Sequence, residues 1–398
     1  MKSRAEEFEE WGTEVIFGRA RGFRATMMRM ILRGASWLFK LVVLLRLRLF
    51  HARMLRQARL GTLVVSVGNI TVGGTGKTPV VELLARTLTK RGRKVAILTR
   101  GYKSEDLDAP QSWLDERGQP VPNLPKIASD GATRYLGPLH SGDEPFMLAK
   151  NLDGVAVLVD KNRIKSGIFA IEHLGCDTLL LDDGMQYLKL AHELDIVLVD
   201  CGAPFGTGAM LPRGTMREPK SSLARASYIV LTKCGGKPQD KLIETIRRYN
   251  PVADIIVSNH GPKYLENVFT GERLPLEALQ DKWVACLSGI ARPESFEESL
   301  RSLGAKVEIC RRFPDHHWFE PSELQEFYDR CADRAMDMIV TTEKDAVRLE
   351  APEDKPEVPI YFLRIEVEIH QGEEYWDQCV NRICDISAPR PQDEWSPA

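Results

Sequence analysis

Acidic residues are missing from one long stretch in the first quarter of the chain. No Asp or Glu lies between Val15 and Val81, although the whole sequence of 398 residues carries 56 acidic and 54 basic residues. The stretch is also strongly basic. Its cations are Arg19, Arg21, Arg24, Arg29, Arg33, Lys40, Arg46, Arg48, Arg53, Arg56 and Arg59. A block with charge of a single sign indicates a partner of opposite charge or an unusually solvated surface.

A long uninterrupted hydrophobic run is also missing. Residues 31–50 have the length of a membrane-spanning helix, but cations interrupt them, and a bilayer core disfavours each cation by about 3 kcal/mol. These cations are Arg33, Lys40, Arg46 and Arg48. The segment also lacks the short charged start and the cleavage site of a secretory signal. The sequence therefore excludes both a spanning helix and a signal peptide.

The same segment has the pattern of a helix at a membrane surface. At about 100° per residue, Arg29, Arg33 and Lys40 fall within about 40° of one another. Apolar residues occupy the other side, namely Leu38, Leu41, Val42 and Leu45. Such a helix is expected at the headgroups of an anionic membrane. Packing against the protein's own core is the alternative. Nucleic acid is disfavoured, because aromatic residues are not interleaved for base stacking.

Metal-binding cysteine patterns are absent too. The eight cysteines show no CxxC spacing, and all lie at or after Cys176. This distribution argues against a structural zinc site. We therefore expect reduced, mostly buried thiols in a cytoplasmic protein.

Glycine is concentrated in one short loop. An apolar run over residues 63–70 is followed by glycines at positions 73, 74 and 76, and then by Lys77 and Thr78. Such a turn can point successive backbone N–H groups at a phosphate, and the following helix adds the positive end of its dipole. Lys77 is expected to reach the outer phosphates, and Thr78 to bind the Mg²⁺ of a nucleotide. We predict a phosphate-binding loop for ATP or GTP.

The loop is a variant of the usual pattern. Thr71 stands five positions before Gly76, where the strict pattern has Gly. An ordinary strand-to-helix turn with a solvated lysine is the alternative. The predicted nucleotide-binding residues are Thr71, Val72, Gly73, Gly74, Thr75, Gly76, Lys77 and Thr78.

Short apolar segments alternate with helical segments after the loop. Strands are expected at residues 94–99, 155–159, 178–181, 195–200 and 227–232. This alternation predicts an α/β fold with a P-loop NTPase-like parallel sheet and helices on both faces. A smaller C-terminal α/β unit is expected, with strands at residues 283–287, 307–310 and 338–342 and helices at 293–303 and 321–336.

The predicted organisation has four segments. They are a basic amphipathic membrane-associated segment (1–60), a P-loop kinase domain (61–258), a smaller α/β domain (259–386) and a disordered tail (387–398).

Two adjacent acids follow one predicted strand. In open parallel sheets, ligands bind outside the carboxyl ends of the strands. Asp182 and Asp183 occupy that position, where P-loop proteins place a magnesium-binding acid. A turn in which both aspartates only cap the next helix is the alternative. We predict a metal site formed by Thr78, Asp182 and Asp183.

Taken alone, Asp143 and His316 are uninformative. Asp143 begins a predicted helix and is most simply explained as its N-cap. His316 follows Pro314 and Asp315, and nothing in this short segment distinguishes it from an ordinary surface or core histidine.

Several motifs in a fixed order carry a family resemblance. The sequences SVGN, TVGGTGKTP, TRGY, GDEP, LDDGMQ, LP with REP, FPDH and TTEKD occur in that order, at residues 66–69, 71–79, 99–102, 142–145, 181–186, 211–219, 313–316 and 341–345. Together they resemble the tetraacyldisaccharide 4'-kinase family of lipid A biosynthesis. The resemblance extends from about residue 60 to residue 350.

The resemblance implies a transferase that moves the γ-phosphoryl group of ATP, with Mg²⁺, to the 4'-hydroxyl of a tetraacylated glucosamine disaccharide 1-phosphate. It implies an Asp–His catalytic pair, which by motif falls on Asp143 and His316. His316 belongs to the predicted second domain, so domain closure is expected to assemble the pair. The implied location is peripheral, on the cytoplasmic face of the bacterial inner membrane, in lipopolysaccharide synthesis. No nucleic acid and no obligate protein partner are expected.

One residue departs from the family pattern. After the DDG motif the family commonly has His, where this chain has Tyr187. The roles of Tyr187, Thr342, Lys344 and Asp345 are left open. A membrane-recruited regulatory ATPase without a lipid-sugar acceptor is the alternative function. Val72 argues against it, because such ATPases often carry Lys at that position.

Overall fold

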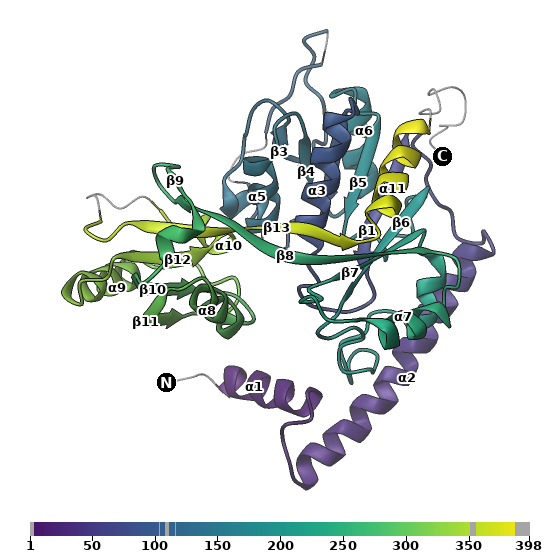
Figure 1. Ribbon diagram of the computed structural model, residues 1–398. Helices are drawn as coiled ribbons and strands as arrows, with labels where there is room; N and C mark the ends of the chain where they lie inside the picture. Colours follow the sequence, from purple (N-terminus) through teal and green to yellow (C-terminus); the bar gives the residue numbers. More distant parts are fainter. Residues whose placement is uncertain (1–3, 103, 108–110, 116, 351–355, 387–398) are drawn as a thin grey trace. The chain divides into compact units, whose positions relative to one another are not determined.

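The computed structural model describes residues 4–102, 104–107, 111–115, 117–350 and 356–386 (Figure 1). Contacts between Cα atoms divide the chain into two compact units. Unit 1 comprises Met1–Thr99, Asn162–Asn259 and Glu368–Ala398. Unit 2 comprises Arg100–Lys161 and His260–Val367. The chain therefore passes between the units more than once, and each unit is described by itself.

Unit 1 is built on a parallel sheet. Its strands lie in the order β8-β7-β6-β1-β5-β2, and each neighbouring pair is parallel. Their bounds are β1 (Leu63–Asn69), β2 (Val95–Thr99), β5 (Thr178–Asp182), β6 (Leu194–Asp200), β7 (Tyr228–Thr232) and β8 (Asp254–Asn267). Every residue of β1, β2, β5 and β7 is buried, as expected for strands covered on both faces.

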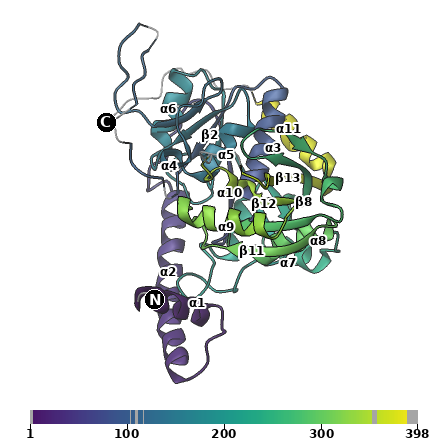
Figure 2. The ribbon, with the colours of Figure 1, turned by 90° about the vertical axis from the view of Figure 1, so that its left-hand side faces the viewer.

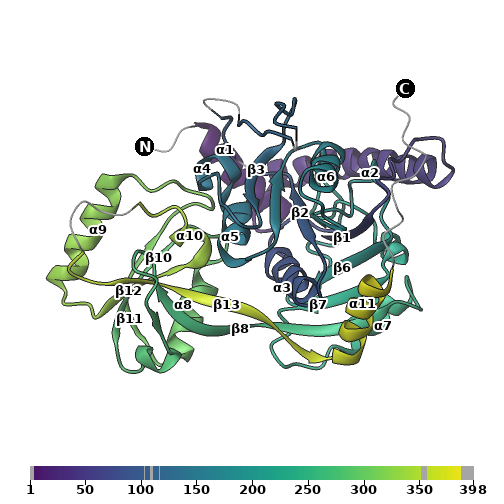
Figure 3. The ribbon, with the colours of Figure 1, turned by 90° about the horizontal axis from the view of Figure 1, so that it is seen from above.

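Helices cover the strands of unit 1 (Figure 3). Helix α3 (Lys77–Lys90) packs on β1, β2 and β5, and α11 (Glu373–Asp385) packs against α3. Helix α6 (Arg163–Glu172) packs closely on β2 and β5. A Cβ at Gly167 of α6 would lie 3.2 Å from the side chain of Leu179 in β5, so the close approach of α6 to this strand favours glycine. Helix α7 (Asp240–Arg247) and the 3₁₀-helix η1 (Lys220–Arg225) also belong to unit 1. The predicted fold class is confirmed.

Two helices precede the first strand (Figure 2). Helix α1 (Arg4–Ile16) contacts α2 (Phe23–His51). One face of α2 packs on unit 1 through Phe39 and Val43, and the Ser36 hydroxyl donates to the Met210 carbonyl at 2.8 Å. Among the described residues, none of the helices has the length and apolar character needed to cross a membrane.

Unit 2 contains the smaller α/β arrangement. Its parallel strands lie in the order β11-β10-β12-β13. They are β10 (Trp283–Ser288), β11 (Lys306–Arg312), β12 (Met338–Thr342) and β13 (Ile360–Gln371), with the helices α8 (Pro293–Ser302), α9 (Pro321–Asp333), α10 (Glu343–Ala346) and the 3₁₀-helix η2 (Leu276–Leu279). The short strand β9 (Arg273–Leu274) pairs antiparallel with the second half of β8.

Unit 2 also holds a second group of elements. Strand β3 (Lys126–Asp130) pairs antiparallel with β4 (Ala156–Val159). Helix α5 (Asp143–Asn151) contacts both strands, and α4 (Pro138–Ser141) contacts β3. Helix α10 contacts α5. This contact connects the two chain segments of unit 2, residues 100–161 and residues 260–367.

The units and the predicted segments divide the chain differently. The predicted change at residue 259 coincides with a boundary between units, but it lies inside the continuous strand β8. Residues 100–161 group with unit 2, and residues 368–386 with unit 1. The sequence analysis did not identify β3, β8, β13, α7 and α11. Residues 387–398, predicted as a tail, lie outside the described residues.

Candidate active site

The phosphate-binding loop joins β1 to α3. Gly73 and Gly76 have φ of 114° and 82°, in the region that favours glycine, and Gly76 is the N-cap of α3. The side chains of Thr75 and Thr78 are buried, whereas Val72 is exposed. Among the described residues, Thr75 Oγ1 is a buried polar atom without a hydrogen-bond partner. A phosphate oxygen would satisfy it, so the loop fits the predicted nucleotide.

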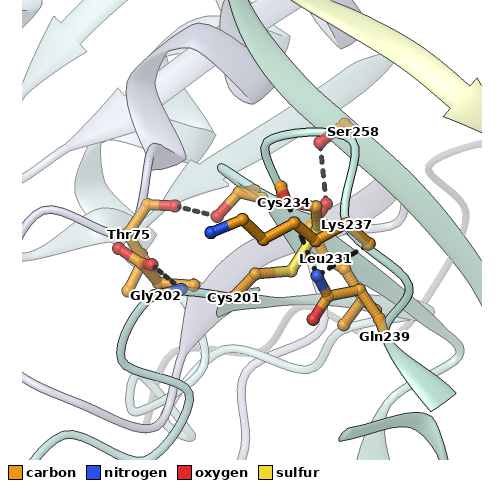
Figure 4. The surroundings of a disulfide bond; sticks show 10 residues. Thr75, Cys201, Gly202, Leu231, Cys234, Lys237, Gln239 and Ser258 are labelled. Atoms are coloured by element: carbon orange, nitrogen blue, oxygen red, sulfur yellow. Dashed lines mark hydrogen bonds between the residues drawn. A yellow bond between two sulfur atoms is a disulfide. The ribbon is translucent and has the colours of Figure 1, made fainter.

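The loops after β6 and β7 support the phosphate-binding loop (Figure 4). The Thr232 hydroxyl donates to the Thr75 carbonyl at 2.8 Å. Lys233 donates to the Gly74 carbonyl and to Asp200 Oδ2. These contacts hold the loop backbone from the side of β7.

A disulfide joins the same two loops. Cys201 follows β6, Cys234 lies two residues after β7, and their sulfur atoms are bonded (Figure 4). The expectation of reduced thiols was therefore wrong for this pair. Their separation of 33 residues gave no signal in the sequence, because only the parallel pairing of β6 and β7 brings them together. The remaining six cysteines are free.

The two predicted metal-binding acids have different surroundings. Asp182 is the register partner of Val67 on β1, and its Oδ2 accepts a 3.3 Å hydrogen bond from the Thr99 hydroxyl. Both oxygens of Asp183 accept from the guanidinium of Arg217 at 2.7 Å, and Lys77 Nζ lies 3.5 Å from its Oδ1. Arg217, the arginine of the REP motif, therefore binds Asp183.

Charge around Asp183 determines its protonation. Burial opposes ionisation, but the Arg217 hydrogen bonds and the charge of Lys77 outweigh it and hold the pKa of Asp183 well below its usual range. The carboxylate is therefore ionised at neutral pH and fixes Lys77 and Arg217 beside the loop. The described residues contain no cluster of three or more His, Cys, Asp or Glu side chains able to hold a metal ion.

Tyr187 connects its loop to the start of α6. Its hydroxyl accepts from the backbone N–H of Arg163 at 3.1 Å and donates to Asn162 Oδ1 at 3.3 Å. Asn162 is the N-cap of α6. In this chain the residue that departs from the family pattern therefore stabilises a helix N-terminus.

Asp143 and His316 form a hydrogen-bonded pair within unit 2. His316 Nδ1 lies 2.9 Å from Asp143 Oδ2, and Asp143 is buried. Gly142 is the N-cap of α5, so Asp143 is the first helical residue and not the cap. His316 has φ of 64°, which is unusual for a residue other than glycine. Because both residues belong to unit 2, the expectation that domain closure assembles the pair was wrong.

Residues 342–348 surround this pair. Lys344 Nζ lies 3.0 Å from His316 Nε2, and the guanidinium of Arg348 lies 3.6 Å from Asp143 Oδ2. Arg348 also pairs with Asp345. Burial raises the pKa of Asp345, and the charge of Arg348 opposes this shift. These contacts were not predicted, since the motif gave no chemical signal by itself.

A phosphate-binding loop with its lysine, together with a buried Asp–His pair, defines a P-loop phosphotransferase. Comparisons with known proteins agree. Residues 28–384 match the family described as tetraacyldisaccharide-1-P 4'-kinase, LpxK. The chain belongs to the tetraacyldisaccharide-1-P 4'-kinase family. It is therefore a kinase that acts on a hydroxyl group.

Individual relatives are similar over most of their length. The tetraacyldisaccharide 4'-kinase of Anaeromyxobacter dehalogenans (strain 2CP-C) is 42% identical over 78% of this chain and 79% of its own. That of Anaeromyxobacter sp. (strain K) is 40% identical over 89% and 90%. The crystal structure of LpxK from Aquifex aeolicus in complex with ATP superposes with a TM-score of 0.69 at 28% identity, covering 89% of this chain and 99% of that one.

Proposed function

We propose that the protein transfers the γ-phosphoryl group of ATP to the 4'-hydroxyl of a tetraacylated glucosamine disaccharide 1-phosphate, with Asp143 as the general base. The hydrogen bond between the buried Asp143 carboxylate and His316 is the observation that carries this proposal. Family membership supports the substrates.

Asp143 activates the acceptor in this mechanism. The 4'-oxygen forms a bond to the γ-phosphorus while the bond from that phosphorus to the bridging oxygen of ADP breaks. The hydroxyl proton passes to the carboxylate of Asp143, whose Oδ2 is held by His316. His316 thereby orients the base and stabilises its position.

The residues of unit 1 hold the donor. The phosphate-binding loop from Thr71 to Thr78 supplies backbone N–H groups, and Lys77 compensates the phosphate charge. Thr78 and Asp182 offer the hard oxygen ligands that Mg²⁺ prefers, while both oxygens of Asp183 are already engaged by Arg217. Bound Mg²⁺ would neutralise charge on the phosphates.

Phosphate transfer from labelled ATP to a lipid extract containing the acceptor tests these roles. The Asp143→Asn and His316→Gln proteins are expected to lose at least ~100-fold in kcat while still binding ATP. Asp337→Asn is a matched control, because Asp337 pairs with Lys282 on the surface of unit 2. Unchanged turnover in both variants would contradict the roles of the pair. Label released only as free phosphate by the wild type would favour an ATPase.

We further propose that α2 binds an anionic membrane from the cytoplasmic side as a peripheral element. Its exposed apolar residues recur every three or four positions, and they are Met27, Met30, Ile31, Trp37, Leu38, Leu41, Val42 and Leu45. At about 100° per residue this stripe lies opposite the buried positions 25 and 36 and the partly buried position 43. The helix therefore packs on its own unit with one face, and the other is available for lipid.

The cations of α2 have two different roles. Arg29 donates to the Val15 and Ala20 carbonyls and so joins the two N-terminal helices. Arg33 and Lys40 are exposed beside the stripe, where anionic headgroups would meet them. The expectation that Arg29 acts together with them toward lipid is replaced by this structural role.

Co-sedimentation with phosphatidylglycerol vesicles tests the membrane proposal. Substitution of Leu38, Leu41 and Leu45 by Gln is expected to reduce the bound fraction at least ~10-fold, because the apolar area available to the bilayer is lost. A control protein carries Leu114→Gln and Val252→Gln, two exposed apolar residues outside α2. Equal binding by the triple variant and the control would contradict the proposal.

A further inference from the structure

We propose that Lys344 is a positioning residue that determines the tautomer of His316, so that His316 donates its Nδ1 proton to Asp143. The inference deepens the proposed function of the Asp143–His316 pair and rests on it for its effect on turnover. It assigns a role to Lys344 of the TTEKD motif (residues 341–345), whose role the sequence analysis left open.

The contacts at His316 Nε2 carry the inference. Lys344 Nζ lies 3.0 Å from Nε2 and 3.1 Å from Asp315 Oδ1. Lys344 Nζ thus contacts both Nε2 and the Asp315 carboxylate, and an ammonium group has hydrogens to donate but no lone pair to accept. Nε2 must therefore accept, which leaves the ring proton of neutral His316 on Nδ1. Asp315 itself lies 3.9 Å from Nε2, beyond hydrogen-bond distance.

The other side of the ring fits this assignment. Nδ1 lies 2.9 Å from Asp143 Oδ2, so a proton on Nδ1 makes a charge-assisted hydrogen bond. A proton on Nε2 would instead place a lone pair of Nδ1 against the carboxylate. The ring of Tyr102 meets His316 edge-on with centroids 5.4 Å apart. Lys344 thus makes His316 a donor that holds the base.

The residues next to Lys344 hold the pair in place. The Asp345 carboxylate accepts from the Gly289 N–H at 3.0 Å, and the Gly289 carbonyl accepts from the His316 N–H at 3.3 Å. The backbone of His316 is therefore tied to the residue that follows Lys344. A Cβ at Gly289 would lie 3.1 Å from Asp345 Oδ1, so this close approach favours glycine.

The segment of residues 342–348 contacts both ends of α5. Arg348 lies 3.6 Å from Asp143 at the start of the helix, while Glu343 accepts from Asn151 at its end. Glu343 is held in turn by Arg364 of β13 at 2.7 and 2.8 Å. The segment thus positions the base, the histidine and the cation that orients it.

The ¹⁵N resonances of the histidine ring test the tautomer directly, in the protein without substrate. Histidine-labelled wild type is expected to show a protonated Nδ1 and an unprotonated Nε2 for His316, identified by comparison with His316→Gln. In Lys344→Met we expect the Nε2–H form to gain population. A wild type with the proton on Nε2 would overturn the inference, and so would Lys344→Met with an unchanged tautomer.

Measurements of kcat and KM on the Lys344 variants distinguish a positioning role of Lys344 from a role in folding. Lys344→Met is expected to lower kcat about 10- to 100-fold and to change KM for ATP less than about 3-fold, because only orientation of the base is lost. Lys344→Arg keeps a donor and is expected to stay within about 5-fold of wild type. Lys282→Met removes a surface lysine of the same unit as the control. An unchanged kcat in Lys344→Met would overturn the inference.

Two results keep the outcomes distinct. If Lys344→Met does not fold, the wild-type and Lys344→Arg tautomers decide, with Nδ1–H in both as support and Nε2–H as contradiction. If the wild type shows Nδ1–H but transfers no phosphate to lipid, the proposed function fails while the tautomer assignment stands.

Discussion

Arg217 has a structural role beside the phosphate-binding loop. Its guanidinium binds both oxygens of Asp183 and also donates to the Asn69 carbonyl at 3.2 Å. A bidentate pair of this kind fixes the geometry of both partners. Asp183 in turn lies 3.5 Å from Lys77, so the position of the phosphate-binding lysine depends on Arg217.

The Arg217→Met protein is expected to be less stable in a pH-dependent way. The folded pKa of Asp183 is depressed, so the pair contributes stability above the unfolded pKa of about 4 and loses it as the pH falls toward the folded value. The melting temperature should drop by about 2–4 °C at pH 7, since the pair is partly exposed to solvent. The difference from wild type should shrink between pH 4 and the acid limit of folding. A difference that grows toward low pH would contradict this assignment, and Arg248→Met, at a solvent-exposed ion pair, is the control.

At the scale of elements, the loops after β6 and β7 act together. The disulfide between Cys201 and Cys234 joins them beside the phosphate-binding loop (Figure 4). Backbone contacts reinforce the connection, since the Cys201 N–H donates to the Thr232 carbonyl at 2.9 Å. The parallel sheet brings the strand ends together, and the disulfide constrains the loops that follow.

Cys201→Ser combined with Cys234→Ser is expected to destabilise unit 1. Closing a loop of 33 residues removes unfolded-state entropy equivalent to about 3–4 kcal/mol in the chain-entropy account. Thermal denaturation should show a lower midpoint for the double variant, and dithiothreitol should lower the wild type to the same value. Cys384→Ser, a free cysteine, should behave as wild type. Complete alkylation of all thiols in the unreduced wild type would contradict the disulfide.

At the scale of the whole molecule, the donor site and the Asp–His pair belong to different compact units. The phosphate-binding loop lies in unit 1, whereas Asp143 and His316 lie in unit 2. The strands β8 and β13 run through both units, so the chain connects them covalently along two extended segments. Nucleotide binding and base function are therefore separable by mutation.

ATP with Mg²⁺ is expected to raise the melting temperature through unit 1 alone. At a free concentration 100 times Kd, binding stabilises the folded state by about 2.7 kcal/mol. Lys77→Met should lose most of this shift, because Lys77 compensates the phosphate charge. His316→Gln should retain it, since the pair lies in the other unit. A full shift in Lys77→Met, or none in His316→Gln, would contradict the assignment.

The elements that the sequence predicted are each identified by a pattern of residues that are close together in the chain. Short, mostly apolar runs such as β1 and β5 identify buried parallel strands, and the glycine pattern after β1 identifies the phosphate-binding loop. Strands β8 and β13 lack that signal, because both continue from one unit into the other and their burial changes along their length. The hydrophobic pattern is therefore interrupted although the strand is continuous.

The sequence by itself determined the phosphate-binding loop, the basic amphipathic helix and the parallel sheet, because each depends on residues close together in the chain. Only the tertiary structure decided which distant residues act together. The family resemblance implied the Asp143–His316 pair, and the structure brings the two side chains within hydrogen-bond distance. The structure also places Lys344 at Nε2 of that histidine and joins Cys201 to Cys234. These partners lie between 28 and 173 residues apart. Contacts over such separations arise from sheet topology and packing, which no local pattern encodes.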